Sequence, residues 1–173
     1  MHSFKIGEFE INKDGTFIIS ELSGNHANNL QIILDSILES KKAGANAIKI
    51  QTFTADSMTL NIDNEEFMCN PNGLWKNRRL YDVYEEASIP YDWYDQIFSY
   101  AKEVGILIFS SPFDKEAVDL LEKYNVPAYK IASFEITDYE LIKYTASKMK
   151  PILISTGIAT IDEIQGMIVD MYR

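Results

Sequence analysis

The chain has 173 residues, 46% of them hydrophobic and 24% charged, a profile typical of a globular protein of one or two small domains. No apolar stretch approaches the ~20 residues that a membrane helix needs, and the N-terminus has no apolar signal-peptide core. The formal charge of −10 disfavours nucleic acid, because phosphate polymers would be repelled. A single cysteine, Cys69, allows no internal disulfide and fits a reducing compartment. We therefore expect a cytoplasmic protein that binds neither membranes nor nucleic acid.

The pattern along the chain predicts a short hairpin and then alternating strands and helices. Residues 4–11 have strand character and Asn12-Lys13-Asp14-Gly15 is a strong turn signal, so we predict a hairpin within residues 1–15 that turns there. Short β-rich strings then recur, each followed by a helical pattern. The five predicted strands are residues 16–22, 47–53, 106–113, 128–133 and 151–157.

Local signals mark the ends of several predicted helices. Apolar residues recur at helical spacing over residues 30–38, with Asn29 as the candidate N-cap and Gly44 beyond the end. Residues 137–140 and 160–163 both have the form of a capping box. These signals predict five helices, one after each strand.

The step from the second to the third strand is much longer than the others. Its extra material, residues 54–90, follows the carboxyl end of a strand, where ligands bind in α/β folds. Long loops in compact domains are usually functional or disordered. Trp75, with Arg78 and Arg79 nearby, could cover a sugar or an anion, and packing of the loop through one aromatic residue is the alternative.

Two arrangements of five parallel strands fit this pattern. Length alone favours a doubly wound open sheet, because a closed eight-stranded barrel typically needs ~250 residues. A barrel therefore requires residues beyond these 173. In one arc of a barrel the five strands lie side by side in sequence order, whereas a doubly wound sheet inserts the first strand centrally.

Two lysines lie on strands that should be apolar if both faces of a parallel sheet were buried. Lys49 and Gln51 share one face of the second strand, opposite two isoleucines, and Lys130 lies between two alanines on the same face of the fourth. Lysine is rarely buried without a partner, so two inward lysines indicate a shared anionic ligand. The alternative is that both lie on exposed edge strands.

Hydroxyl groups end the last three strands. Ser111, Ser133 and Ser155 stand there, and phosphate sites are often built from such hydroxyls and free backbone donors. Any one of them is also an ordinary helix cap. Three in register with two inward lysines form a more specific pattern.

Two further polar side chains follow the first strand. Glu21 could act as a base or a ligand, or form a salt bridge to a lysine such as Lys49. His26 has no local metal-binding partner, and a lone loop histidine is more often a hydrogen-bonding residue than a ligand, although it could contact substrate.

Taken together, these strings resemble the sialic acid synthases, which condense phosphoenolpyruvate with an amino sugar. The matching segments are residues 19–26, 41–52, 109–113, 129–133 and 154–157, in the family's order and spacing. Residues 73–75, 80–84 and 131–135 resemble most the pseudaminic acid branch, with the N-acetylneuraminate and legionaminate branches as alternatives.

The resemblance implies an eight-stranded TIM (β/α)8 barrel followed by a small antifreeze-like domain, with residues 16–173 holding the first five βα units. The remaining strands, that domain and the two histidines that hold a divalent metal, Mn or Mg, would lie outside these residues. We therefore expect a truncated product or part of a longer protein, a homodimer when full length. Residues 1–173 alone are expected to show no synthase activity.

The resemblance also assigns roles to individual residues. Phosphoenolpyruvate would be bound by Lys49, Ser111, Lys130, Ser133 and Ser155. The family more often has threonine where Ser111 stands, which keeps the hydroxyl. Glu21 would lie by the sugar aldehyde and handle a water or hydroxyl proton. The sugar side would include Asn25, His26 and Gln51, and residues 54–90 would help to choose the sugar.

The implied reaction begins when C3 of phosphoenolpyruvate attacks the metal-polarised aldehyde of an open-chain diacetamido trideoxy hexose. Water then adds at C2, and C–O cleavage expels phosphate to give pseudaminic acid. Two other interpretations stay open: a Schiff-base aldolase with Lys130 as its nucleophile, which borohydride would trap, and a non-catalytic phosphosugar-binding fragment.

Overall fold

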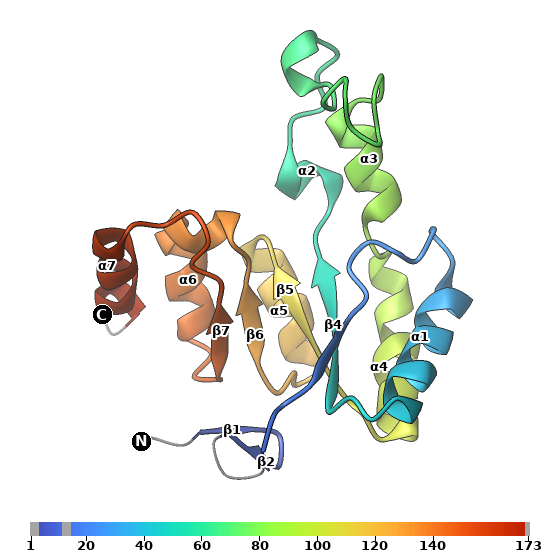
Figure 1. Cartoon of the computed structure of the whole chain (residues 1–173), viewed down its shortest axis with the longest axis vertical. Helices are drawn as coiled ribbons and strands as arrows, with labels where there is room; N and C mark the ends of the chain where they lie inside the picture. Colours follow the sequence, from blue (N-terminus) through green and yellow to red (C-terminus); the bar gives the residue numbers. More distant parts are fainter. Residues whose placement is uncertain (1–3, 12–14, 172–173) are drawn as a thin grey trace.

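A five-stranded parallel sheet organises the computed structural model, which describes residues 4–11 and 15–171 (Figure 1). Its strands are β3 (Ile19–Glu21), β4 (Ala47–Thr52), β5 (Leu107–Pro112), β6 (Tyr129–Ile131) and β7 (Ile152–Ile154). They lie side by side in sequence order, all parallel. The predicted order is confirmed. The doubly wound arrangement is wrong, because β3 lies at the edge of the sheet and not at its centre.

Each strand leads into a helix. The long helices are α1 (Leu30–Lys42), α4 (Tyr94–Val104), α5 (Lys115–Lys123), α6 (Tyr139–Ala146) and α7 (Ile161–Met171). Between β4 and α4 the chain leaves the sheet through α2 (Ala55–Met58), the 3-10 turn η1 (Glu65–Phe67) and α3 (Leu80–Ala87). We call residues 54–90 the excursion, and Figure 1 shows it projecting beyond the carboxyl end of β4. Two more 3-10 turns are η2 (Tyr91–Trp93) and η3 (Phe134–Thr137).

The helix caps follow the sequence signals with one correction. Asn29 caps α1 by accepting from the Gln31 amide at 2.9 Å, and Thr160 and Glu163 form the predicted capping box before α7. At α6 the cap is Asp138 rather than Thr137. Thr137 still belongs to η3, so the next residue is the first whose side chain is free to cap the helix.

The N-terminal hairpin turns earlier than predicted. β1 (Lys5–Ile6) pairs antiparallel with β2 (Phe9–Glu10), and Gly7 makes the turn at a φ of +59°, a conformation that glycine adopts without strain. The prediction that residues 4–11 form a single arm of the hairpin is therefore wrong, and the predicted turn falls on residues 12–14, which lie outside the described part of the chain. The tight turn between β1 and β2 forms because Gly7 adopts the positive φ that it requires.

This hairpin covers the amino end of the sheet. Ile6 is 1% exposed and belongs to the main apolar core. A Cβ atom at Gly7 would lie 2.9 Å from Leu107 Cδ1, so the turn packs directly on the first residue of β5. The hairpin thus covers part of the amino end of the sheet.

The two faces of the sheet differ in chemistry. On the helix side, Tyr94 of α4 donates to Thr52 Oγ1 at 2.9 Å, and Thr52 lies 2.6 Å from Ser110 Oγ. These hydroxyls are fully buried behind the strands. Lys49 and Gln51 alternate with Thr52 along β4, so they point to the opposite face, which carries the polar groups. No helix in the described residues is long and apolar enough to span a membrane.

Candidate active site

The polar face begins with an ion pair between two neighbouring strands. Glu21 is in register with Lys49, and Glu21 Oε2 pairs with Lys49 Nζ. The other carboxylate oxygen accepts from the Ser23 amide at 3.0 Å. Lys49 is 13% exposed and Glu21 41%. The salt bridge considered for Glu21 is therefore present, and it holds the carboxylate at the carboxyl end of β3.

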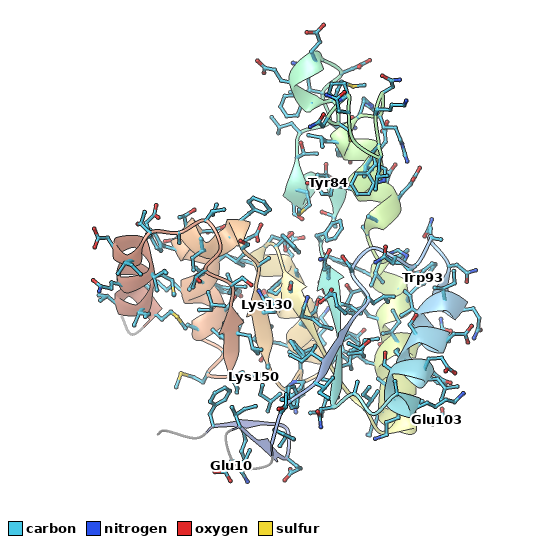
Figure 2. All side chains as sticks on the ribbon, viewed as in Figure 1. Glu10, Tyr84, Trp93, Glu103, Lys130 and Lys150 are labelled. Atoms are coloured by element: carbon cyan, nitrogen blue, oxygen red, sulfur yellow. The ribbon has the colours of Figure 1, made fainter. Side chains whose placement is uncertain are left out.

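Lys130 provides the second cation of this face. Its Nζ donates to Ser155 Oγ at 2.6 Å and to the Ile131 carbonyl at 2.5 Å. Burial lowers the pKa of Lys130, and the charge of Lys49 lowers it further. β4 and β6 each have a strand on both sides, so the edge-strand alternative is wrong for both lysines. Figure 2 shows Lys130 within the sheet.

Three serines stand at the carboxyl ends of β5, β6 and β7. Ser111 is 1% exposed, is in register with Gln51, and lies 3.5 Å from Lys49 Nζ. Ser133 Oγ abuts the turn after β7, since a Cβ atom at Gly157 would lie 2.3 Å from it. Ser111 and Ser155 thus each lie against one of the two lysines, whereas Ser133 lies against the turn after β7.

Glu135 is a site residue that received no role from the sequence. One of its carboxylate oxygens, Oε2, is buried and has no hydrogen-bond partner among the described residues. Burial raises the pKa of Glu135, while the charge of Lys130 opposes that shift. The available signal was its place two residues after Ser133 in a string that resembles the family.

The three residues predicted on the sugar side have different surroundings. Gln51 and Asn25 line a common cavity beside the excursion. His26 is fully buried: its Nε2 donates to the Ala87 carbonyl at 2.9 Å and its Nδ1 accepts from the Asn28 amide at 3.2 Å. Both ring nitrogens are therefore engaged, and we assign His26 to holding the loop after β3 against α3.

The arginines of the excursion are also engaged. Arg78 forms a bidentate pair with Glu86 at 2.9 and 2.5 Å, and Arg79 pairs with Asp82. These pairs brace the excursion internally. An anion cover built from Arg78 and Arg79 therefore has no support, whereas Trp75, 54% exposed, borders the cavity that Gln51 lines.

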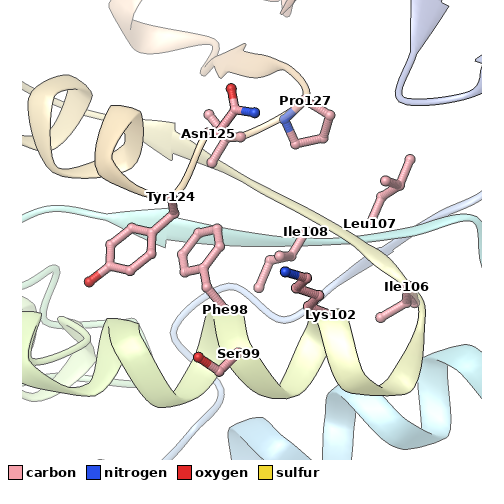
Figure 3. A pocket seen from close by; sticks show the side chains of 10 residues that line it. Phe98, Ser99, Lys102, Ile106, Leu107, Ile108, Tyr124, Asn125 and Pro127 are labelled. Atoms are coloured by element: carbon pink, nitrogen blue, oxygen red, sulfur yellow. The ribbon is translucent and has the colours of Figure 1, made fainter.

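Another hollow, of about 380 Å³, lies at the opposite end of the strands (Figure 3). It is bordered by Phe98 and Lys102 of α4, by the start of β5 and by residues 125–127 before β6. Ligands of α/β folds bind at carboxyl strand ends. We therefore assign this hollow no part in the site.

Among the described residues, no group of three or more His, Cys, Asp or Glu side chains lies close enough to hold a metal ion. The part of the chain that the structure describes therefore does not form a site for the divalent metal that the resemblance implies.

Comparison with known proteins identifies the family. A profile of the NeuB family matches residues 36–172, most of the chain. The chain belongs to the NeuB family. A pseudaminic acid synthase of Campylobacter jejuni is 52% identical over 160 residues, which are 92% of this chain and 46% of that protein. A pseudaminic acid synthase of Helicobacter pylori is 44% identical over 87% of this chain and 44% of its own.

Solved structures agree on the fold. The crystal structure of an N-acetylneuraminic acid synthetase from Leptospira borgpetersenii superposes with a TM-score of 0.84 at 24% identity, over 99% of this chain and 55% of that one. At this identity the likeness supports the fold alone. The chain spans about half the length of the curated relatives it matches.

Proposed function

We propose that this NeuB chain supplies the phosphoenolpyruvate site of a nonulosonic acid synthase that forms pseudaminic acid. The observation that carries the proposal is the pairing of Lys49 with Ser111 and of Lys130 with Ser155 at the carboxyl ends of four neighbouring strands. Phosphoenolpyruvate carries a phosphate and a carboxylate, and two cations with several hydroxyl donors match that charge and geometry. The 52% identity to a pseudaminic acid synthase supports the same branch.

Residues 16–173 would then be the first five βα units of a TIM barrel. Sequence-ordered parallel strands with helices on one face and polar groups on the other support this assignment. Residues 1–15 would form a separate hairpin below the barrel floor. In such a barrel the active site lies at the carboxyl ends of the strands, where the lysines and serines gather.

The chain's own residues suffice to derive how phosphoenolpyruvate is held. Lys49 and Lys130 would neutralise its phosphate and carboxylate, and Ser111, Ser133 and Ser155 would orient it. An incoming anion would compete with Glu21 for Lys49, because these two side chains pair directly. Binding would therefore release the Glu21 carboxylate toward the reacting atoms.

Glu21 would then serve as the base for hydration. C3 of phosphoenolpyruvate bonds to the aldehyde carbon, whose oxygen becomes a hydroxyl after taking up a proton. Water adds at the electron-poor C2 and gives a proton to Glu21. The C2–O bond to phosphate breaks, phosphate leaves with the bridging oxygen, and the C2 hydroxyl loses its proton to form the ketone.

The test is the fate of that bridging oxygen. The full-length protein is incubated with a diacetamido trideoxy hexose and phosphoenolpyruvate that carries oxygen-18 at the C2–O bridge. We expect sugar-dependent phosphate release with the label in phosphate. Absence of release, or label retained in the sugar acid, would contradict the proposed reaction.

A Schiff-base aldolase is the second candidate, because the lowered pKa of Lys130 is the property that an amine nucleophile needs. If Lys130 were the nucleophile, it would form a Schiff base with a keto acid, and borohydride would reduce that C=N bond to a stable secondary amine. Our proposal expects no such adduct, since Lys130 acts as a charged hydrogen-bond donor.

A further inference from the structure

A cavity of about 270 Å³ lies between the loop after β3, the end of β4 and the excursion. We call it the excursion cavity. It is smaller than the roughly 300–1,000 Å³ typical of pockets that enclose a whole small-molecule ligand. Its size suits one substituent of a sugar that is bound elsewhere.

The walls of the excursion cavity carry no formal charge. They combine apolar side chains, among them Phe53, Leu80 and Val83, with the amides of Gln51 and Asn25, and none of the lining residues is Asp, Glu, Lys or Arg. In the described part of the chain, the Gln51 amide has no hydrogen-bond partner. A charged amine or phosphate would be costly to bury here, whereas a neutral group with a polar amide and an apolar end would match.

Contacts from three segments hold these walls in place. Phe53 makes edge-to-face contacts with Tyr84 of α3 and with Phe113 after β5, at centroid distances of 6.0 and 5.5 Å. Across the cavity, a Cβ atom at Gly24 would lie 3.0 Å from Ala87 Cβ, so the loop after β3 approaches α3 closely. The cavity is thus preformed, which lowers the entropic cost of binding.

The cavity also adjoins the proposed phosphoenolpyruvate site. Gln51 follows Lys49 by two residues on the same face of β4, a separation of about 6.6 Å along a strand. Gln51 is also in register with Ser111 of β5. A six-carbon sugar whose aldehyde meets phosphoenolpyruvate near Lys49 would extend a substituent past Gln51 into the cavity.

From these observations we infer that the excursion cavity binds an acetamido group of the sugar substrate. The amide of that group hydrogen-bonds Gln51, and its methyl group lies against Phe53, Leu80, Val83 and Tyr84. This inference rests on the proposed function for the identity of the sugar. It makes the excursion the part of the chain that distinguishes N-acetylated sugars from those with free amines.

The test uses Trp75, which borders the cavity, as a fluorescence reporter in full-length protein carrying Trp93→Phe. The probes are the alditol of the diacetamido trideoxy hexose, which has no aldehyde and cannot react, and its counterpart with two free amines. We expect saturable binding of the diacetamido alditol. The diamine should bind at least about tenfold more weakly, because it lacks the methyl group and the amide that contact the cavity. Equal affinity for the two alditols would overturn the inference.

Two variants locate the binding. Val83→Phe fills the cavity and Gln51→Leu removes its free amide. Each is expected to lower the affinity for the diacetamido alditol by about tenfold. Glu85→Phe places the same new side chain on the exposed face of α3 and should leave binding unchanged. Unaltered affinity in both Val83→Phe and Gln51→Leu would refute the cavity as the site.

The proposed function is judged by a separate readout. If wild-type protein binds the diacetamido alditol in the excursion cavity but releases no phosphate from phosphoenolpyruvate with the aldehyde sugar, the proposed reaction fails and the cavity assignment stands. If phosphate is released but Val83→Phe and Gln51→Leu do not change the affinity for the diacetamido alditol, the reaction stands and the cavity assignment fails.

Discussion

The carboxyl ends of the strands and the excursion differ in how they recognise a ligand. Lys49 and Lys130 present charge and hydrogen-bond donors from two interior strands. The excursion, through Val83 and Tyr84, offers an uncharged, largely apolar cavity with a free amide at its edge. The strand ends are therefore chemically suited to an anion, whereas the excursion is suited to an uncharged group.

We call Glu21, Lys49 and Lys130 with their serine partners the strand-end site. Glu21→Gln removes its proposed base and should have the largest effect. Turnover should fall by about a hundred- to ten-thousandfold, because the variant cannot accept the water proton. Phosphoenolpyruvate affinity should not fall, since Lys49 loses a competing carboxylate. The measurement is kcat with the Kd of phosphoenolpyruvate.

Glu39→Gln is the matched control, because Glu39 also pairs with a lysine, Lys42, but on the exposed face of α1. It should leave turnover unchanged. Near-normal turnover by Glu21→Gln would remove Glu21 from the mechanism.

Removing either cation tests the anion site itself. Lys49→Ala or Lys130→Ala should weaken phosphoenolpyruvate binding by roughly ten- to a hundredfold, because each loses a charge-assisted contact. Binding of the diacetamido alditol should change much less. Calorimetric titration of both ligands measures the difference, and unchanged phosphoenolpyruvate affinity in both variants would refute the anion site.

His26→Leu tests the anchor between the two regions. It deprives the Ala87 carbonyl and the Asn28 amide of their buried partner, so the free energy of unfolding should drop by about 1–3 kcal/mol. Urea denaturation measures the change. Sugar affinity should fall more than phosphoenolpyruvate affinity, because α3 forms the cavity wall. Unchanged stability would show that this anchor is unimportant.

The lowered pKa of Lys130 predicts a pH dependence confined to the strand-end site. Phosphoenolpyruvate binding needs the protonated amine, so affinity should decline on the alkaline side below the usual range of a free lysine. The unfolded chain holds this proton more tightly, so the same titration adds stability as pH rises. Lys130→Arg should move the loss of affinity to higher pH, and an identical profile in both proteins would contradict the assignment.

Arg78→Gln should have the smallest effect. Arg78 already pairs with Glu86 within the excursion, so phosphoenolpyruvate affinity should stay unchanged while Lys130→Ala, titrated alongside, loses it. A clear loss of affinity in Arg78→Gln would revive the anion-cover interpretation of the excursion.

The sequence made the strand-end site predictable because a period of two is a local property. Lys49 and Gln51 could be placed on one face from their spacing alone, and the structure bears out that placement. Strand limits were less predictable: residues 151–157 contain only Ile152–Ile154 as strand, because the partner strand β6 is itself only three residues long. The hairpin turn at Gly7 was missed because the sequence signal at residues 12–15 was the stronger one, although Gly7 adopts the positive φ that a turn between β1 and β2 needs.

The excursion cavity could not be predicted in the same way. Its walls come from residues 23–25, from the end of β4 and from α3, and only tertiary packing brings them together. The role of His26 was hidden for the same reason, since its partner Ala87 lies 61 residues away. Glu135 stood in a recognised string, but its buried oxygen is a property of the folded chain.

The most direct test of the two-region account is a crossed binding experiment. The affinities of phosphoenolpyruvate and of the diacetamido alditol are measured for full-length wild type, Lys130→Ala and Val83→Phe. The account predicts that Lys130→Ala loses phosphoenolpyruvate and keeps the alditol, whereas Val83→Phe loses the alditol and keeps phosphoenolpyruvate. Equal losses of both ligands in both variants, or the reverse pattern, would contradict it.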